Sequence, residues 1–307
     1  MTEKKFETDF GAIHYWANDI CPKKKTLVFL PGLTADHRLF DKQIEVFEKK
    51  YNLLTWDAPG HAASRPFRLD FSLMDKATWL HAILQKEGIS SPILIGQSMG
   101  GYVSQCFMQK YPGEAAGFIS IDSAPLKRSY VTGAEIWLLK RTEPMYRAFP
   151  WSILKKIGAD GCATSEYGRK LMRSFLDSYT KDEYCKLAGH GMKLLAEAME
   201  ADLPYVIDCP VILICGEKDQ AGSAKSYNRR WAKREGLPIY RIKDAGHNSN
   251  TDKPKEVNRI IRNFVRSLQE ESQAPMIIKN SAAKNRMPGT SRKIKRDRKT
   301  PINGATA

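Results

Sequence analysis

The segment ILIGQSMGG, residues 93–101, holds a serine between two glycines. The apolar run before Ser98 has the pattern of a buried strand, and the residues after it have the pattern of a helix. A side chain on such a sharp turn projects from the carboxyl edge of a sheet, and Gly96 and Gly100 remove side chains that would clash there. We therefore predict that Ser98 is a nucleophile. The alternative is an inert serine in a tight turn.

A serine hydroxyl needs a general base before it becomes a good nucleophile. Of the six histidines, three lie in loops that follow predicted strands, namely His37, His61 and His247. Such loops meet at the carboxyl edge of a parallel sheet, where ligands bind. All three therefore remain candidates on the residues alone.

The base in turn needs an acid that orients it, and this acid must come from the same edge. Asp219 in GEKDQ directly follows the predicted strand VILIC. Asp122 in IDSAP and Asp57 in WDAPGH are the rival candidates. Asp57 also begins a turn sequence, for which a structural role is the competing interpretation.

The elements that would position these residues alternate between strand and helix patterns. Residues 7–19 suggest a hairpin, and strands are expected at 26–30, 51–57, 92–96, 117–122, 210–219 and 238–244. Helices are expected at 37–50, 72–88, 99–112, 223–235 and 253–269. This alternation predicts an α/β fold with a mostly parallel sheet and helices on both faces.

The alternation breaks at residues 126–208, which contain helix patterns and no convincing strand. We interpret this segment as a helical insertion into a core made of residues 1–125 and 209–270. Its apolar residues either pack it on the core or face Ser98, in which case the substrate has an apolar part. Three nearby cations are candidates to meet an anionic group or form a solvated face: Lys140, Arg141 and Arg147.

The formal net charge of +15 is concentrated at one end of the chain. Residues 275–307 contain nine Lys/Arg and a single acid, Asp297. The composition from residue 271 to 307 is polar and too poor in apolar residues to offset the ordering entropy, which predicts a disordered basic tail. The tail is either a solvated extension or a weak electrostatic contact to nucleic acid or anionic lipid. A targeting role has no support in the sequence.

Nothing in the sequence indicates a secreted or membrane-spanning protein. The N-terminus lacks the apolar segment of a secretory signal, and no apolar run approaches the ~20 residues of a membrane span. The six cysteines show neither a CxxC nor a Cys/His spacing typical of metal sites. We expect a cytoplasmic protein with reduced cysteines.

Five motifs occur in the order typical of one family: FLPGLTADHRLF, WDAPGHAAS, GQSMGG, LICGEKD and AGHNS. Over roughly residues 10–270 the chain resembles the α/β-hydrolase fold superfamily. The resemblance implies the order nucleophile, acid, histidine, which assigns Ser98, Asp219 and His247. Some relatives place the acid at the position of Asp122. It also implies that residues 126–208 form a helical cap.

The resemblance further implies an oxyanion hole made of two backbone amides. One amide belongs to the residue after the nucleophile, here Met99, and the other is expected from Leu33 in PGLT. Many relatives have a His where this chain has Pro31, and a His where it has Gln97. Neither departure removes a donor of the expected oxyanion hole.

These residues predict a serine hydrolase that cleaves a carboxylic ester or thioester through an acyl-enzyme, with a small-molecule substrate that has an apolar part. The reaction requires no organic cofactor and no metal. The same triad also serves the cleavage of an amide, a lactone or a carbon–carbon bond. A different class is a non-catalytic binding protein on the same fold, and labelling of the serine by a fluorophosphonate separates it from the enzymes.

Overall fold

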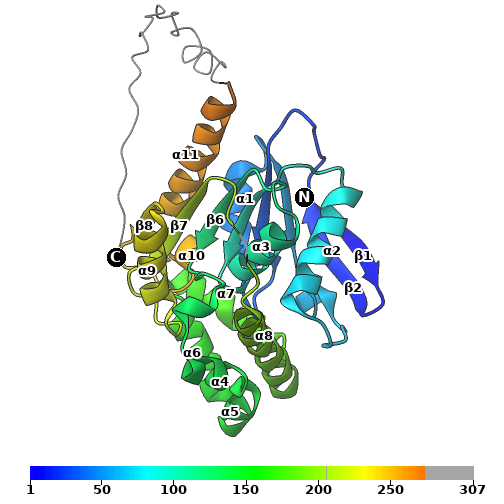
Figure 1. Ribbon diagram of the computed structural model, residues 1–307. Coiled ribbons are helices and arrows are strands. Elements are labelled where there is room, and N and C mark those ends of the chain that lie inside the picture. Colours follow the sequence, from blue (N-terminus) through cyan, green and yellow to red (C-terminus); the bar gives the residue numbers. More distant parts are fainter. Residues whose placement is uncertain (205, 274–307) are drawn as a thin grey trace, which may run out of the picture. The chain divides into compact units, whose positions relative to one another are not determined.

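An eight-stranded sheet forms the centre of the protein (Figure 1). The computed structural model describes residues 1–204 and 206–273 of the 307-residue chain. The strands are β1 (Thr2–Thr8), β2 (Gly11–Ala17), β3 (Thr26–Leu30), β4 (Asn52–Trp56), β5 (Ile93–Gln97), β6 (Gly117–Ile121), β7 (Val211–Gly216) and β8 (Ile239–Ile242).

The strand order is β1-β2-β4-β3-β5-β6-β7-β8. The first two strands form a hairpin that pairs antiparallel with β4, and all pairs from β4 to β8 are parallel. Parallel strands require crossovers, and helices provide most of them. The predicted mostly parallel sheet is confirmed, and its loops after β3 to β8 emerge at one edge.

Helices cover both faces of the sheet (Figure 1). The α-helices of the described residues are α1 (Asp41–Phe47), α2 (Leu73–Lys86), α3 (Met99–Lys110), α4 (Gly133–Leu139), α5 (Thr142–Ala148), α6 (Trp151–Cys162), α7 (Glu166–Asp177), α8 (Lys181–Ala201), α9 (Ala224–Glu235), α10 (Ser249–Asp252) and α11 (Pro254–Gln273). Of these, α4 to α8 fall within the segment predicted as a helical insertion.

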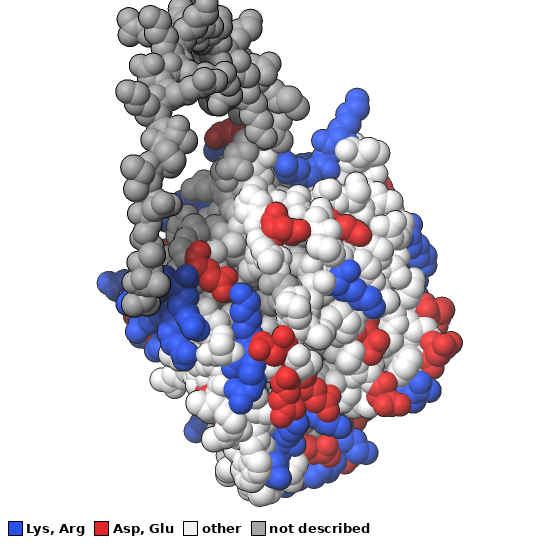
Figure 2. Space-filling view, in the orientation of Figure 1, with Lys and Arg blue, Asp and Glu red and all other residues white. Residues whose placement is uncertain are grey.

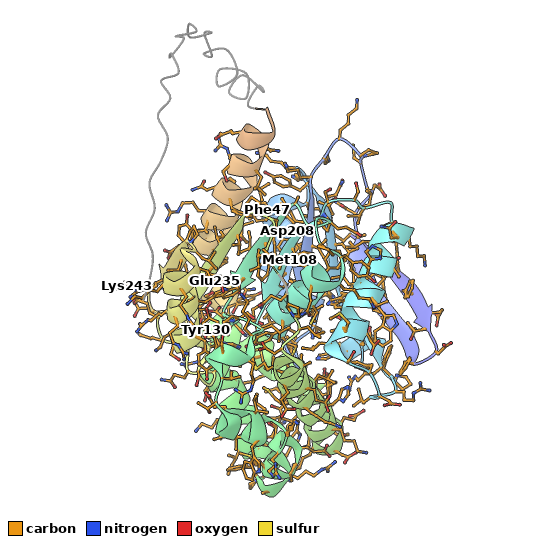
Figure 3. All side chains as sticks on the ribbon, in the orientation of Figure 1. Phe47, Met108, Tyr130, Asp208, Glu235 and Lys243 are labelled. Atoms are coloured by element: carbon orange, nitrogen blue, oxygen red, sulfur yellow. The ribbon has the colours of Figure 1, made fainter. Side chains whose placement is uncertain are left out.

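The sheet separates two apolar clusters because successive side chains of a strand point to opposite faces. On β3, Val28 and Leu30 belong to the cluster that includes residues of α2, α3 and α9, whereas Leu27 and Phe29 belong to the cluster that includes residues of α1 and α11. Met108 on α3 belongs to the first cluster and Phe47 on α1 to the second (Figure 3).

Local sequence explains where α2 begins. Ser72 caps α2 by accepting a hydrogen bond from the Asp75 amide at 3.1 Å, and the Asp75 side chain accepts one from the Ser72 amide at 2.8 Å. This reciprocal pair satisfies two amides that the first helical turn leaves without partners. The predicted cap at Ser72 is therefore present.

Some predicted boundaries differ from the structure. Strand β1 begins at Thr2, earlier than the hairpin predicted from residue 7, and α11 continues to Gln273, past the predicted end of the core at residue 270. The short helix α10 has no counterpart in the sequence prediction.

The predicted basic tail, 271–307, lies outside the described residues apart from the last residues of α11. No helix in the described part of the chain has both the length and the apolar character that crossing a membrane requires.

Candidate active site

Ser98 occupies the turn between β5 and α3, with a backbone φ of 49° and ψ of −116°. A positive φ is unfavourable for a residue other than glycine, so surrounding contacts must hold it. A Cβ at Gly100 would lie 1.9 Å from the Leu30 carbonyl oxygen, and one at Gly96 would lie 2.4 Å from the Gly100 carbonyl carbon. The two glycines are therefore sterically required, as the sequence predicted.

His247 and Asp219 form a buried pair. Nδ1 of His247 lies 3.1 Å from each carboxylate oxygen of Asp219. Burial disfavours the imidazolium, but the charge and hydrogen bond of Asp219, with the charge of Asp122, outweigh burial and raise the pKa of His247. A Nδ1–H donated to Asp219 leaves Nε2 of His247 as the proton acceptor.

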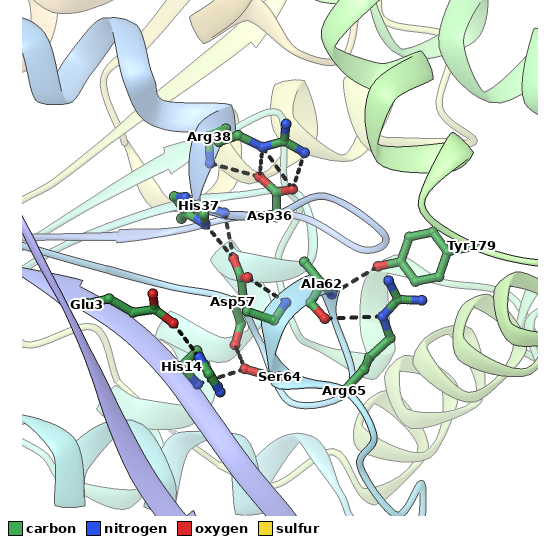
Figure 4. A network of polar contacts seen from close by, with 11 residues as sticks. Glu3, His14, Asp36, His37, Arg38, Asp57, Ala62, Ser64, Arg65 and Tyr179 are labelled. Carbon is green, nitrogen blue, oxygen red and sulfur yellow. Dashed lines mark hydrogen bonds and ion pairs between the residues drawn. The ribbon is translucent and has the colours of Figure 1, made fainter.

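The other histidine candidates lie elsewhere. Nδ1 of His37 lies 2.8 Å from a carboxylate oxygen of Asp57 (Figure 4). The His37 ring stacks on Trp16 with the ring centres 3.6 Å apart. His61 is buried with Nδ1 at 3.1 Å from the Pro59 carbonyl oxygen, and burial lowers the pKa of His61 to about 3. Asp57 therefore connects the loop after β3 with the loop after β4. It is not bonded to the histidine that lines the cavity with Ser98.

Asp122 is fully buried beside the pair. Its carboxylate accepts hydrogen bonds from the Gly216 amide at 2.7 Å, the Ser249 amide at 2.9 Å and the Ser249 hydroxyl at 2.6 Å. Burial, and then the nearby charge of Asp219, raises the pKa of Asp122. Asp122 thus connects the end of β6 to the end of β7 and to the first residue of α10, shortly after His247.

The two expected oxyanion donors border the same cavity as Ser98. Met99 is the first residue of α3, so its amide has no acceptor within the helix. Leu33 lies in the loop after β3, on the wall of that cavity. Two amides at these positions are the kind of donor that stabilises an oxyanion.

A cavity of about 540 Å³ opens between the sheet edge and the helices α4 to α8. Ser98 and His247 both line it. Its walls are mostly apolar, and the side chains from the inserted helices include Leu138, Leu139, Tyr146, Ile157, Met172, Met192, Leu195 and Met199. Part of the predicted apolar surface of the insertion therefore lines the cavity that Ser98 also lines.

The three cations predicted near this pocket are absent from its wall. They contact other residues of the inserted helices: Lys140 pairs with Glu200, Arg141 lies over the Trp137 ring, and Arg147 pairs with Glu143 and Asp182. Figure 2 shows positive and negative side chains interspersed over this part of the surface. The interpretation of a solvated charged face agrees with these contacts.

Comparison with known proteins identifies the family. The pattern of the alpha/beta hydrolase family matches residues 27–260, which is most of the chain. The chain belongs to the alpha/beta hydrolase family. The predicted family, fold class and enzyme class, an α/β-fold hydrolase, are confirmed.

Three similar proteins share about a fifth of their residues with this hydrolase. The uncharacterized hydrolase YugF of Bacillus subtilis is 23% identical over 274 residues, which cover 86% of this chain and 97% of YugF. A thermophilic esterase from Thermogutta terrifontis superposes with a TM-score of 0.71 at 19% identity, covering 87% of this chain and 99% of the esterase. The enol-lactonase from Burkholderia xenovorans LB400 superposes with a TM-score of 0.68 at 18% identity, covering 86% of this chain and 100% of the enol-lactonase.

Sequence reasoning about this hydrolase did not foresee the role of Gln97. The buried Gln97 side chain donates hydrogen bonds to the His247 carbonyl oxygen at 2.9 Å and to Oδ1 of Asn248 at 3.1 Å. The residue before Ser98 therefore fixes the loop that carries His247. A polar residue inside an apolar strand was the available signal.

A second contact that the sequence did not reveal ties the same loop to the inserted helices. The Asp252 carboxylate accepts hydrogen bonds from the Gly246 amide at 2.7 Å, the Ser165 amide at 2.8 Å and the Thr164 hydroxyl at 3.0 Å. The Asn248 amide donates to a carbonyl oxygen of α6 at 2.7 Å. We call these contacts the histidine-loop clamp.

Two groups of potential metal ligands occur among the described residues. One comprises Asp36, His37 and Asp57, and the other Asp122, Cys215 and Asp219. Carboxylate oxygens of both groups already accept hydrogen bonds from the protein. All six cysteines lie in the described part of the chain, and none forms a disulfide.

Proposed function

We propose that this protein is a serine hydrolase that cleaves a carboxylic ester or thioester through an acyl-enzyme. The observation that carries the proposal is the cavity that Ser98 and His247 line together, with Asp219 bonded to the far side of the imidazole. The similar structure from Thermogutta terrifontis is that of an esterase, which supports an ester as the substrate.

In the proposed first half-reaction, Oγ of Ser98 forms a bond to the carbonyl carbon while Nε2 of His247 takes the hydroxyl proton. Asp219 holds the imidazole in the required tautomer and stabilises the imidazolium. The amides of Leu33 and Met99 donate to the oxyanion. Collapse of the tetrahedral intermediate breaks the bond to the leaving alcohol or thiol, which receives the proton from His247.

In the second half-reaction, water attacks the acyl-enzyme. Nε2 of His247 accepts a proton from the water as the new carbon–oxygen bond forms, and then returns it to Oγ of Ser98 when the acyl bond breaks. The carboxylic acid leaves and the free serine is restored. Every step uses groups of this chain and water.

The apolar lining from α4 to α8 supports a substrate with an apolar part. A cavity of about 540 Å³ is within the ~300–1,000 Å³ typical of small-molecule sites. Such a volume suits an acyl chain of medium length rather than a polymer. The inserted segment that carries α4 to α8, which we call the cap, thus sets the size of the substrate, and the sheet edge performs the chemistry.

The test is hydrolysis of p-nitrophenyl esters from acetate to long acyl chains by the wild type and by Ser98→Ala in parallel. We expect wild-type activity with an optimum in chain length, and a loss of at least about 10³-fold in kcat for the variant. Full activity of Ser98→Ala would defeat the proposal.

A fluorophosphonate probe separates the alternatives. Labelling of Ser98 without ester turnover would move the assignment to an amide, a lactone or a carbon–carbon bond. Absence of both labelling and turnover would favour a non-catalytic binding protein.

A further inference from the structure

The charges that border the cavity are unbalanced. Among the described residues that line it, none is Lys or Arg, whereas Asp122, Glu135 and His247 are present. The three cations that are candidates to meet an anionic group, Lys140, Arg141 and Arg147, contact other side chains of the inserted helices instead. Among these described lining residues, an anionic substrate therefore meets no Lys or Arg as a counter-ion.

Glu135 on α4 is fixed in the cavity wall by four hydrogen bonds. The Thr132 amide and hydroxyl each donate to one carboxylate oxygen at 2.8 Å. The other oxygen accepts from the Ser223 hydroxyl at 2.9 Å and from the Tyr227 hydroxyl. Because donors come from both the cap and the core, the carboxylate cannot swing out to solvent without breaking contacts on both sides.

This carboxylate stays charged at neutral pH. Burial opposes the charge, but the hydrogen bonds from Tyr227 and Thr132 outweigh it and lower the pKa of Glu135 to about 2. A unit charge acts over several ångströms in a site that is partly screened from water. The Glu135 carboxylate would therefore repel a negatively charged group of the substrate.

We infer that Glu135 selects substrates by charge, so that the cavity accepts an uncharged or cationic acyl group and disfavours one that ends in a carboxylate. The inference rests on the proposed serine-hydrolase function, since it concerns the acyl group that Ser98 receives. Specificity of this kind comes from repulsion of the wrong substrate as much as from attraction of the right one.

The experiment compares p-nitrophenyl esters in pairs of matched shape. The adipate monoester carries a terminal carboxylate, and 6-methylheptanoate is its neutral counterpart. The ester of 6-(trimethylammonio)hexanoate is cationic, and 7,7-dimethyloctanoate is its neutral counterpart. In the wild type we expect kcat/KM for the anionic ester to be about tenfold below that of its neutral counterpart. For the cationic ester we expect kcat/KM to be at least equal to that of its neutral counterpart.

Three variants identify the source of the discrimination. Glu135→Gln should raise the anion-to-neutral ratio at least about threefold, because it removes the charge and keeps the shape. Tyr227→Phe removes a hydrogen bond between cap and core but keeps the charge of Glu135, so the anion-to-neutral ratio of kcat/KM should not change. Glu143→Gln is the matched control, since Glu143 is an acid of the cap that pairs with Arg147 and does not line the cavity.

The result that would overturn the inference is an equal ratio in the wild type and Glu135→Gln, or equal wild-type rates within each pair. Fluorophosphonates with neutral, anionic and cationic tails keep this failure separate from that of the proposed function. No labelling of Ser98 by any tail contradicts the serine mechanism. Labelling of Ser98 at one rate by all three tails contradicts only the selection by charge.

Discussion

The sheet edge and the cap meet at one cavity but are built differently. At the edge, Ser98 is held by backbone geometry, with glycines at which a Cβ would clash, and the buried Gln97 side chain is hydrogen-bonded to the loop of His247. In the cap, apolar side chains form the wall, and Trp137 and Ile157 remain 56% and 57% exposed. Steric contacts and hydrogen bonds thus fix the edge, whereas the cap includes large apolar side chains that stay exposed.

This difference suggests a division of labour. Chemistry requires fixed distances, so the edge relies on steric exclusion and hydrogen bonds whose loss is costly. Substrate choice requires a volume and a polarity, which many apolar side chains provide equally well. Substitutions at the edge should therefore affect kcat and stability, and substitutions in the cap should affect KM.

The largest expected effect at the edge is that of Asp219→Asn. We expect kcat to fall about 10³-fold or more, because the amide no longer stabilises the imidazolium. Wild-type kcat/KM should fall as pH falls through the pKa of His247, since a protonated imidazole cannot accept a proton. Because Asp219 raises that pKa, its removal should move the acid limb to lower pH. Asp244→Asn, at an exposed acid paired with Lys218, is the control; an unmoved acid limb contradicts the assignment.

Gly100→Ala should be next in size and should act on stability. The added Cβ would meet the Leu30 carbonyl 1.9 Å away, so the turn must shift and the free energy of unfolding should drop by about 3 kcal/mol. Gly161→Ala on α6 is the matched control, because a Cβ there meets nothing within 4 Å. Thermal unfolding measures both, and equal melting temperatures would show that the edge is less constrained than the contacts imply.

Gln97→Leu should have a smaller effect, confined to the histidine loop. Loss of the two donated hydrogen bonds should lower kcat about tenfold with little change in KM. The control is Gln43→Leu, because Gln43 is an equally buried amide that bonds to Asn250 and Asn258 instead. A similar fall in kcat for both variants would mean that stability, not the position of His247, is responsible.

The smallest effect is expected in the cap. Leu138→Ser should raise KM about threefold for long acyl chains and leave acetate unchanged, because the side chain lines the cavity. Ile153→Ser is the control, because Ile153 is similarly exposed on α6 without lining the cavity. If kcat rather than KM changes, the contrast between edge and cap is wrong.

Much of the core could be predicted because its signals are local. The run TLVFL is buried on both faces and forms β3 with the predicted bounds, Thr26–Leu30. The turn at Ser98 could be recognised because only glycine fits at positions 96 and 100. The choice among three histidines needed the resemblance, since the residues alone left His37, His61 and His247 equivalent.

The rest was hidden because its partners are distant in the sequence. Gln97 and His247 are 150 residues apart, and no local pattern announces their hydrogen bond. In the local sequence, Glu135 has the pattern of a capping box with Thr132 at the start of α4. Its contacts to Ser223 and Tyr227 follow only from the tertiary structure. Apolar residues at helical spacing likewise do not show which ones face a cavity and which ones pack.

The histidine-loop clamp has a consequence for anyone who wishes to exchange the cap. Asp252 binds Thr164 and Ser165 of the cap and Gly246 of the core through one carboxylate. A cap transplanted from another hydrolase would replace two of these three partners and leave a buried carboxylate without them. The chimera would then inherit the new pocket but lose contacts that hold the loop of His247, so the graft boundaries should be drawn to retain residues 162–165.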